Sequence, residues 1–297
     1  MAEFETLSRG WDHLGNIERT LGDLQGARTA IHELIQNADD APGATRMRFR
    51  VTPDRLEVWN DGIFERCSDV TSAECGWLGE RKHRCDFHSF RKTASGDKRN
   101  RPGTTGAFGV GFTAVYQFTD RPELLSNGEH WIVEETAPES ERIKRHPTGS
   151  DADGTTFRLP WAFEQSAFRA AVRQEPITRA FVETFANQLL AAVPDAMPFL
   201  KKLRSIEVVD PQLSRTFTRT VSQGRITIAD DAGGRREWAL LHGEFEGEAQ
   251  ALRAAHSGVI GIARDSRVSV AVPIGGDMQG GLLYATLPTE EPAHLPL

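Results

Sequence analysis

The sequence lacks the marks of several large classes of protein. Its 297 residues include only three cysteines, an odd number without the spacing of a disulfide framework, which favours a reducing compartment. No apolar run approaches the length that crosses a bilayer. Residues 1–12 are acidic and have no apolar stretch of the kind found in signal peptides. We therefore expect a cytoplasmic protein that makes no membrane contact.

An excess of positive charge is also missing. The formal net charge is −7, which argues against a surface built for duplex DNA, although it leaves room for a local basic patch. Hydrophobic residues make up 39% and charged residues 26% of the chain, which is the balance of a soluble globular protein. The length is enough for a sizeable core, in one large domain or in two ordinary ones.

The usual spacing of zinc ligands is absent as well. Cys75, His83, Cys85 and His88 lie close together in the sequence, and thiolate and imidazole are zinc ligands. However, the chain has no CxxC pair, and the interval from Cys75 to Cys85 is not a standard ligand interval. The sequence therefore does not favour a metal site at these residues.

The pattern of apolar residues differs between the two parts of the chain. Apolar periodicity predicts helices over residues 16–41, with a break near Gly22 or Gly26. Beyond Leu203 the pattern is that of strands, so a domain boundary is expected near residue 200. The Pro-rich end suggests a fragment of a longer protein, although a naturally short protein would look the same. The other expected elements are paired strands at 45–51 and 55–59, a long partly helical segment at 62–105, a glycine-rich loop leading into a helix at 106–118, strands near 130–134 and 155–159, and helices over 163–193 closed by Pro194.

One predicted helix, IHELIQNADDA at residues 31–41, carries polar residues at a notable spacing. Each helical residue advances 100°, so Glu33, Asn37 and Asp40 lie within about 60° of one another. An amide oxygen suits Mg²⁺, and a carboxylate one turn earlier can take a proton from a water that attacks a phosphate. The alternative is an ordinary solvated stripe. The residues expected to face the core are Ile31, Leu34, Ile35 and Ala38.

A phosphate-binding loop would complete such a site. The segment Gly106-Ala107-Phe108-Gly109-Val110-Gly111 precedes an apolar helical stretch, and glycines let backbone N–H groups wrap phosphate oxygens. It is not a Walker A loop, because no Lys-Ser/Thr follows, and a turn or helix-packing pattern of glycines remains an alternative. The basic stretch at 81–101 could close over a triphosphate, contact nucleic acid, or form a solvated loop.

Three segments in this order, ELIQNADDA, LEVWNDGIF and GAFGVGF, resemble the GHKL ATPases, which have the Bergerat ATP-binding fold. A fourth, DGTTFRLPW, resembles the late Gly-Thr strand of that fold. QNADDA, FGVGFTAVYQFTDRPELLS, GTTFRLP and FLKKLRSIEV are similar to segments of sacsin-like proteins. The resemblance implies an α+β fold, with a two-layer α/β sandwich at 1–165, a helical connector at 166–204 and a smaller β-rich domain at 205–297.

The resemblance also implies roles for the residues of the predicted helix and the glycine loop. Glu33 would be the base that activates water, Asn37 would bind Mg²⁺ through its side-chain oxygen, and Asp40 would help to order the nucleotide pocket. The implied phosphate contacts are Gly106, Ala107, Phe108, Gly109, Val110 and Gly111.

The adenine end departs from the family pattern. Asn60 stands where the family has the Asp that accepts a hydrogen bond from adenine, and Asp61 could replace it after a shift of one residue. Phe64 replaces the second glycine of this turn, beyond Gly62, and Thr155 would stand beside the adenine end. The basic residues that could reach the γ-phosphate, or form a solvated cluster instead, are Lys201, Lys202 and Arg204.

The function implied is Mg²⁺-dependent ATP binding and hydrolysis, in which a lid at 62–105 closes and drives a conformational change. A nucleotide-dependent homodimer, a protein client, and chaperone-like or defence work are expected by analogy. Two alternatives remain: a nucleotide-gated binding or scaffold module with negligible hydrolysis, and a DNA-directed ATPase of the MutL type, which the basic stretch at 81–101 alone supports.

Overall fold

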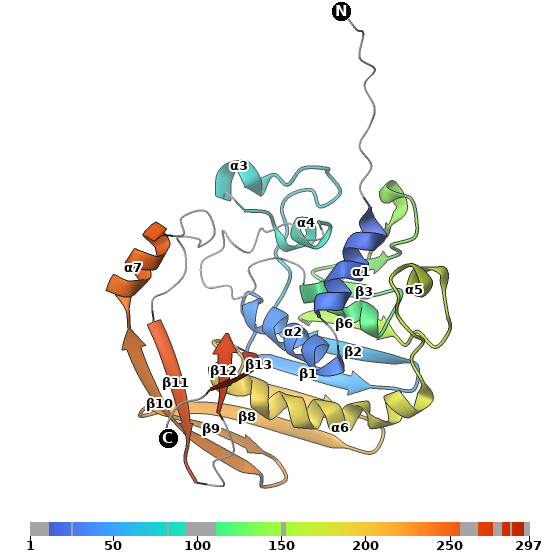
Figure 1. The fold of residues 1–297 in the computed structure, drawn as a ribbon. Coiled ribbons are helices and arrows are strands. Elements are labelled where there is room, and N and C mark those ends of the chain that lie inside the picture. The colour runs from blue at the N-terminus through green and yellow to red at the C-terminus, as the bar shows by residue number, and fades with distance from the viewer. Residues whose placement is uncertain are drawn as a thin grey trace, which may run out of the picture.

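The computed structural model describes residues 12–24, 26–81, 83–92, 111–149, 153–255, 267–275, 281–285 and 287–293. Figure 1 shows the helices and strands in chain order. The helices are α1 (His13–Asp23), α2 (Ala27–Asp40), α3 (Trp77–Arg81), α4 (Asp86–Phe90), α5 (Ala167–Ala171), α6 (Arg179–Ala196) and α7 (Glu246–Ala255), with 3₁₀ turns η2 (Gly111–Gln117), η3 (Glu139–Glu141) and η4 (Met197–Phe199).

Eleven strands form one mixed sheet in the order β11-β10-β9-β8-β7-β1-β2-β6-β3-β4-β5. Neighbouring strands run antiparallel except β1 and β7, which pair in parallel. A separate pair is formed by β12 (Gly281–Ala285) and β13 (Leu287–Ala293). The strands of the large sheet are β1 (Arg46–Val51), β2 (Arg55–Asn60), β3 (Glu123–Ser126), β4 (Glu129–Val133), β5 (Ile143–Pro147), β6 (Thr155–Pro160), β7 (Ser205–Val209), β8 (Ser214–Ser222), β9 (Arg225–Asp230), β10 (Arg235–Glu244) and β11 (Arg267–Pro273).

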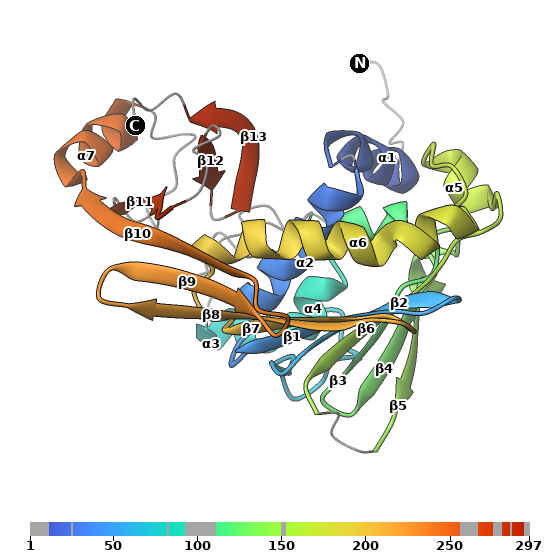
Figure 2. The ribbon, with the colours of Figure 1, turned by 90° about the horizontal axis from the view of Figure 1, so that it is seen from below.

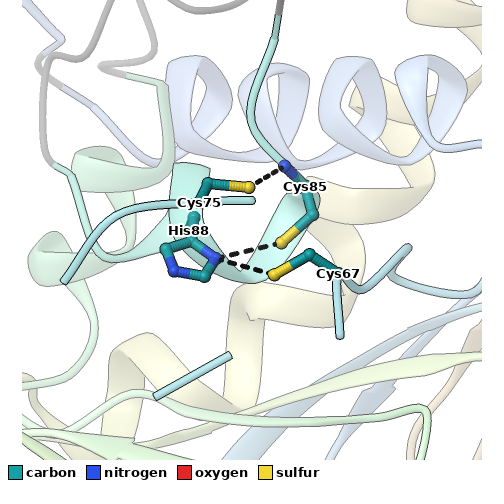
Figure 3. Close-up of side chains that lie close together, drawn as sticks. All are labelled: Cys67, Cys75, Cys85 and His88. Atoms are coloured by element: carbon teal, nitrogen blue, oxygen red, sulfur yellow. Dashed lines mark hydrogen bonds between the residues drawn. The ribbon is translucent and has the colours of Figure 1, made fainter. Parts of the chain in front are cut away.

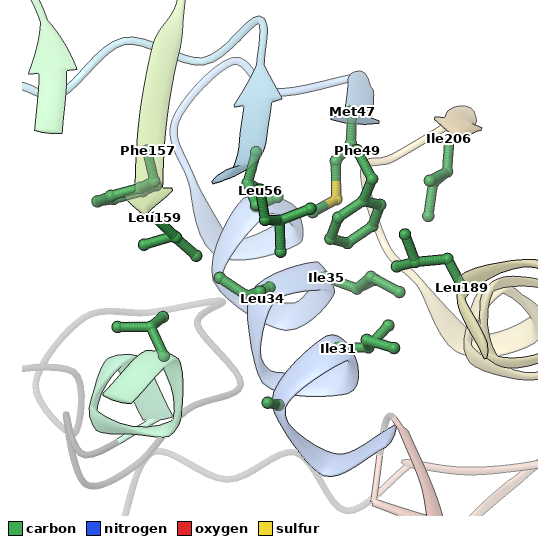
Figure 4. Close-up of a cluster of buried hydrophobic side chains, with 14 of the residues drawn as sticks. Ile31, Leu34, Ile35, Met47, Phe49, Leu56, Phe157, Leu159, Leu189 and Ile206 are labelled. Atoms are coloured by element: carbon green, nitrogen blue, oxygen red, sulfur yellow. The ribbon is translucent and has the colours of Figure 1, made fainter. Parts of the chain in front are cut away.

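The centre of the molecule is the contact between α2, α6 and the middle of this sheet. Figure 2 shows α2 and α6 on the same face of the sheet, and Figure 4 shows their side chains meeting those of β1, β2, β6 and β7. The apolar face predicted for α2 is confirmed, because Ile31, Leu34, Ile35 and Ala38 are all buried. Each fully buried aliphatic side chain of this kind stabilises the fold by about 1.5–3 kcal/mol. The buried partners include Met47, Phe49, Leu56, Leu159, Leu189 and Ile206.

The expected fold class is wrong. A two-layer sandwich followed by a smaller β-rich domain requires two separate sheets, whereas a single sheet runs through both parts of the chain. The junction is the parallel pairing of β1 with β7, in register from Arg46 with Ser205 to Arg50 with Val209. Since the free edge of β1 needs hydrogen-bond partners, the later strands extend the first sheet. The division at 165 and 204 itself stays a prediction.

The local elements follow the predictions more closely, and the helix break is at one of the two predicted glycines. The helix break lies at Gly26, which has a φ of 92° and is the N-cap of α2, a conformation that glycine adopts without steric cost. Pro194 does not close α6 but lies inside it, and the helix continues to Ala196. Proline has no N–H to donate and so removes one hydrogen bond of the α-helical ladder, and the helix ends two residues later, where η4 begins.

Over the described residues, no helix combines the length and the apolar character needed to reach across a bilayer.

Candidate functional site

The polar face of α2 is directed at the end of the glycine-rich segment. A methyl group placed on Gly111 would come within 2.0 Å of Glu33 Oε2 and within 3.7 Å of Asn37 Nδ2. A side chain at position 111 would displace the Glu33 carboxylate from where it lies. The structure therefore brings Glu33, Asn37 and the last glycine of the segment together. The remaining phosphate residues of the prediction, Gly106 to Val110, lie outside the described residues.

Gly111 begins η2, a run of 3₁₀ helix where an ordinary helix was expected. This element packs on both α1 and α2, and its far end is fixed by Arg169, whose side chain is completely buried. The Arg169 guanidinium donates to Gln117 O at 3.0 Å and to Asp120 Oδ1 at 2.8 Å. The position of Gly111 against α2 is thus set by packing and by a buried charge-assisted network.

The turn after β2 is held by hydroxyl and amide side chains of three strands. Asn60 is buried at the end of β2, and its Oδ1 accepts a hydrogen bond from Gly62 N at 3.0 Å. Thr155 Oγ1 donates to Gly62 O at 2.8 Å and lies 2.8 Å from Ser126 Oγ. Phe64 N in turn donates to Ser126 Oγ at 3.0 Å. The predicted residues Asn60, Gly62 and Thr155 are therefore neighbours in space.

Asp61 faces away from this network. Its carboxylate accepts from the backbone N–H groups of Thr45 and Arg46 at 2.7 and 2.8 Å, and from both of their side chains. Burial acts to raise the pKa of Asp61, but these hydrogen bonds outweigh it and lower the pKa to about 2. Asp61 thus fastens the start of β1 to the end of β2.

A close backbone approach explains the glycine before Thr155. Gly154 has a φ of 96°, and a methyl group on it would lie 2.1 Å from Asn60 O. The Trp59 indole N–H donates to Asp153 O at 2.6 Å and holds the same approach from the neighbouring residue. This pairing of β6 with β2 requires glycine at position 154 and brings Thr155 opposite Asn60.

Phe64 belongs to an aromatic cluster that reaches from the turn to the start of η2. Its ring centroid lies 5.4 Å from that of Phe87 and 6.1 Å from that of Phe157. Phe112, directly after Gly111, lies 4.9 Å from Phe157 and 5.0 Å from Phe90. A phenyl group at position 64 therefore joins the turn to α4 and to η2 through apolar contacts, where the family pattern has a glycine.

The C-terminal end of α2 is tied to the segment before β7. Asp39 accepts from the backbone N–H groups of Lys201, Lys202 and Leu203 at 2.8–2.9 Å. The Lys202 ammonium donates to the carbonyl of Asp40 at 2.9 Å, at the negative end of the helix. Asp40 itself is buried. Lys202 thus contacts α2, and the suggested reach to a γ-phosphate by Lys201, Lys202 or Arg204 stays a prediction.

Sequence reasoning missed Ser126 and Asp39, which position the candidate residues without belonging to their motifs. Ser126 ends a short strand before the turn Asn127-Gly128, and the alternation in β3 places it on the buried face with Leu124. Asp39 sits between the motif residues of α2, but its partners lie more than 160 residues further along the chain. Neither contact can be predicted from neighbouring residues in the sequence, because the partners lie far along the chain.

A cavity of about 900 Å³ lies beside this site. Its lining includes His13, Phe112, Tyr116 and Glu135, so it meets the candidate site at Phe112 but does not include Glu33, Asn37 or Asn60. His13 Nε2 lies 2.5 Å from Glu135, which also accepts from the Tyr116 hydroxyl. Burial and the Glu135 carboxylate raise the pKa of Tyr116 well above 10.

Comparison with known proteins supports the sacsin likeness. Residues 14–146 match the family model described as Sacsin domain. Human sacsin is 27% identical over 245 residues, which cover 72% of this chain and 5% of sacsin. Protein NO VEIN of Arabidopsis thaliana is 33% identical over 103 residues, which cover 34% of this chain and 3% of that protein. The chain thus corresponds to a small part of each of these relatives.

One solved structure with some likeness is described as the N-terminal domain of a DNA repair protein. Its TM-score is 0.37 at 16% identity, over 67% of this chain and 54% of the other. A likeness this slight carries no argument about the fold or the function.

Proposed function

Since residues 14–146 are sacsin-like, we propose that this chain binds ATP with Mg²⁺ and hydrolyses it, as the GHKL ATPases do. The observation that carries the proposal is the convergence of Glu33 and Asn37 on Gly111. A merely solvated polar stripe would face water, whereas Glu33 and Asn37 face the bare backbone of Gly111.

The donor set of this face fits a magnesium–phosphate group. Asn37 would hold Mg²⁺ through its amide oxygen, and the ion, when bound, neutralises charge on the phosphate oxygens. Glu33 would orient a water and take its proton while the water oxygen forms a bond to the γ-phosphorus. The bond from that phosphorus to the bridging oxygen breaks, and ADP leaves with the electron pair. The bare backbone at Gly111 leaves room for a phosphate oxygen beside the carboxylate.

At the adenine end, Asn60 is the better candidate than Asp61. The Asp61 carboxylate is occupied by four donors from Thr45 and Arg46. Asn60 is directed into the turn that Gly62 and Thr155 share, and its amide can present both an acceptor and donors. We also propose work on a protein client, from the sacsin resemblance, and a nucleotide-dependent homodimer, by analogy with the GHKL ATPases.

The test measures ATP binding by calorimetry and Mg²⁺-dependent phosphate release on the same preparations. We expect Glu33→Gln to lower turnover by about 10²–10⁴-fold, with a Kd for ATP within a few-fold of wild type, because it removes the base and keeps the shape. Glu183→Gln, an exposed glutamate of α6, is the matched control and should leave both quantities unchanged.

One result would contradict ATP hydrolysis, and another would contradict ATP binding altogether. If wild type binds ATP but releases phosphate no faster than Glu33→Gln, the chain is a nucleotide-gated binding module. If millimolar ATP with Mg²⁺ produces no binding heat, the nucleotide site itself is wrong.

A further inference from the structure

A second group of polar side chains is buried in the segment that follows β2. The described residues between 61 and 92 form only two helices, of five residues each, yet Cys67, Cys75, Cys85 and His88 are all at most 4% exposed. Figure 3 shows their side chains directed toward one another. One ligand atom from each, three sulfurs and one imidazole nitrogen, lies within 4.8 Å of all the others.

Two of these separations are close to those around a single tetrahedral ion. Zn–S bonds of about 2.3 Å and Zn–N bonds of about 2.0 Å place neighbouring ligand atoms about 3.5–3.8 Å apart. His88 Nδ1 lies 3.2 Å from Cys85 Sγ and 3.5 Å from Cys67 Sγ. The four atoms are therefore close enough for one ion to reach all of them after small shifts.

The histidine is held in the orientation that ligation requires. His88 Nε2 lies 3.1 Å from Ser72 O, so Nε2 carries the proton and donates to that carbonyl. Nδ1 is then left with a lone pair facing the sulfurs. A backbone carbonyl behind a histidine is the usual outer partner of a metal-binding imidazole. Arg91 donates to the same carbonyl at 2.6 Å and to Val70 O at 3.1 Å, which fixes the loop that supplies it.

One backbone N–H group also points at a sulfur. Cys75 Sγ accepts a hydrogen bond from Cys85 N at 3.3 Å, and Cys85 is the N-cap residue of α4. Cys85 and His88 are thus three residues apart on the first turn of that helix. An N–H donor of this kind stabilises negative charge on a thiolate.

We propose that Cys67, Cys75, Cys85 and His88 bind one zinc ion in a closed, structural site. Four protein ligands complete the tetrahedral shell and leave no position for water or substrate, as in Cys₃His structural sites. Soft thiolates select zinc over magnesium or calcium, so this site is distinct from the face of Glu33 and Asn37. The inference rests on this cluster alone and not on nucleotide binding.

The structure changes one member of the set considered from the sequence. His83 is not in the cluster, and its Nδ1 lies 3.1 Å from Arg84 O. Cys67 takes its place, from a stretch eight residues before Cys75. The sequence does not favour a metal site here because its cysteines are widely spaced along the chain. Only Cys85 and His88 are separated by a short interval.

A bound zinc ion would hold together the segment at residues 61–92, whose described residues have little regular secondary structure. Phe87 and Phe90 of α4 lie next to the cluster in sequence and belong to the aromatic group that contains Phe64 and Phe112. By fixing α4, zinc would fix the apolar contacts against the start of η2. A loop that folds only with metal bound converts binding free energy into local stability.

The first test is metal analysis of the full chain, purified without chelator and dialysed against metal-free buffer. We expect about one zinc per chain for wild type. Cobalt exchanged into the same protein should show the intense visible bands of a tetrahedral ion and near-ultraviolet sulfur-to-cobalt charge transfer. The cobalt spectrum needs no variant, so it is independent of any folding defect.

Variants then assign the ligands. Cys67→Ser and Cys85→Ser should each bind zinc at least about a hundredfold more weakly in competition with a chromophoric chelator. His83→Asn, the neighbouring histidine outside the cluster, should keep one zinc at wild-type affinity. The proposal is overturned if wild type equilibrated with zinc retains none, if the cobalt spectrum lacks charge transfer, or if thiol counting after denaturation without reductant shows a disulfide.

Discussion

The two candidate sites lie in regions of opposite construction. Glu33 and Asn37 stand one turn apart on α2, a fourteen-residue helix whose other face is buried against the sheet. Cys67, Cys75 and Cys85 come from separate pieces of a segment with two five-residue helices. Backbone hydrogen bonds and core packing hold the first site whether or not a ligand is bound. The second gathers four ligands without such a scaffold, so an ion contributes more to its order.

The largest difference between the regions should appear on removing metal. A strong chelator, or Cys85→Ser, should cost at least about 3 kcal/mol of unfolding free energy and lower the Tm by about 6–12 °C. Glu33→Gln should change the Tm by about 2 °C or less, because α2 does not depend on that carboxylate. Calorimetric or fluorescence melting measures both, and equal losses in the two variants would remove the contrast.

Gly111→Ala should affect turnover far more than stability. The added methyl group would meet the end of the Glu33 side chain, which can rotate away, rather than backbone. A base displaced by about 1 Å lowers kcat by about a hundredfold, while the free energy of unfolding should change by about 1 kcal/mol or less.

The control is Gly22→Ala on α1, where a methyl group meets nothing within 4 Å. It should keep wild-type turnover and gain about 0.5–1 kcal/mol of stability. A Gly111→Ala protein with normal phosphate release would show that Glu33 does not act beside this glycine.

The last prediction concerns acid sensitivity at α2. Burial, and then the charge of Arg28, lower the pKa of His32 from 6.5 to about 4. The folded protein therefore keeps His32 neutral between pH 6.5 and 4, while the unfolded chain takes up a proton. Stability from this residue is complete above pH 6.5, falls as the pH drops toward 4, and is constant below, a loss of up to about 3 kcal/mol.

Urea unfolding of wild type and His32→Gln at several pH values measures this slope. Only the difference between the two proteins reports on His32, because zinc thiolates also take up protons in acid. The wild-type curve should be steeper than the variant curve between pH 6.5 and 4, and identical slopes would contradict the assignment.

Much of the local structure could be predicted, because it depends on neighbours in the sequence. Ile31, Leu34, Ile35 and Ala38 recur at helical spacing, and they are buried. The helix break lies at Gly26, one of the two glycines at which it was predicted. The single sheet was not predictable in the same way, since the pairing of β1 with β7 joins residues that are about 160 positions apart. The residue pattern of a strand predicts that it needs neighbouring strands, but it does not identify which strand will pair with it.

By itself the sequence determined the polar face of α2, because the spacing of Glu33, Asn37 and Asp40 follows from the geometry of any α-helix. It also determined the turn at Asn60, which contains Gly62. Only the tertiary structure decided that Gly111 lies against Glu33, that Asp61 is occupied by β1, and that Cys67 and not His83 joins Cys85 and His88. Contacts between distant segments depend on how the whole core packs, and no local spacing encodes that.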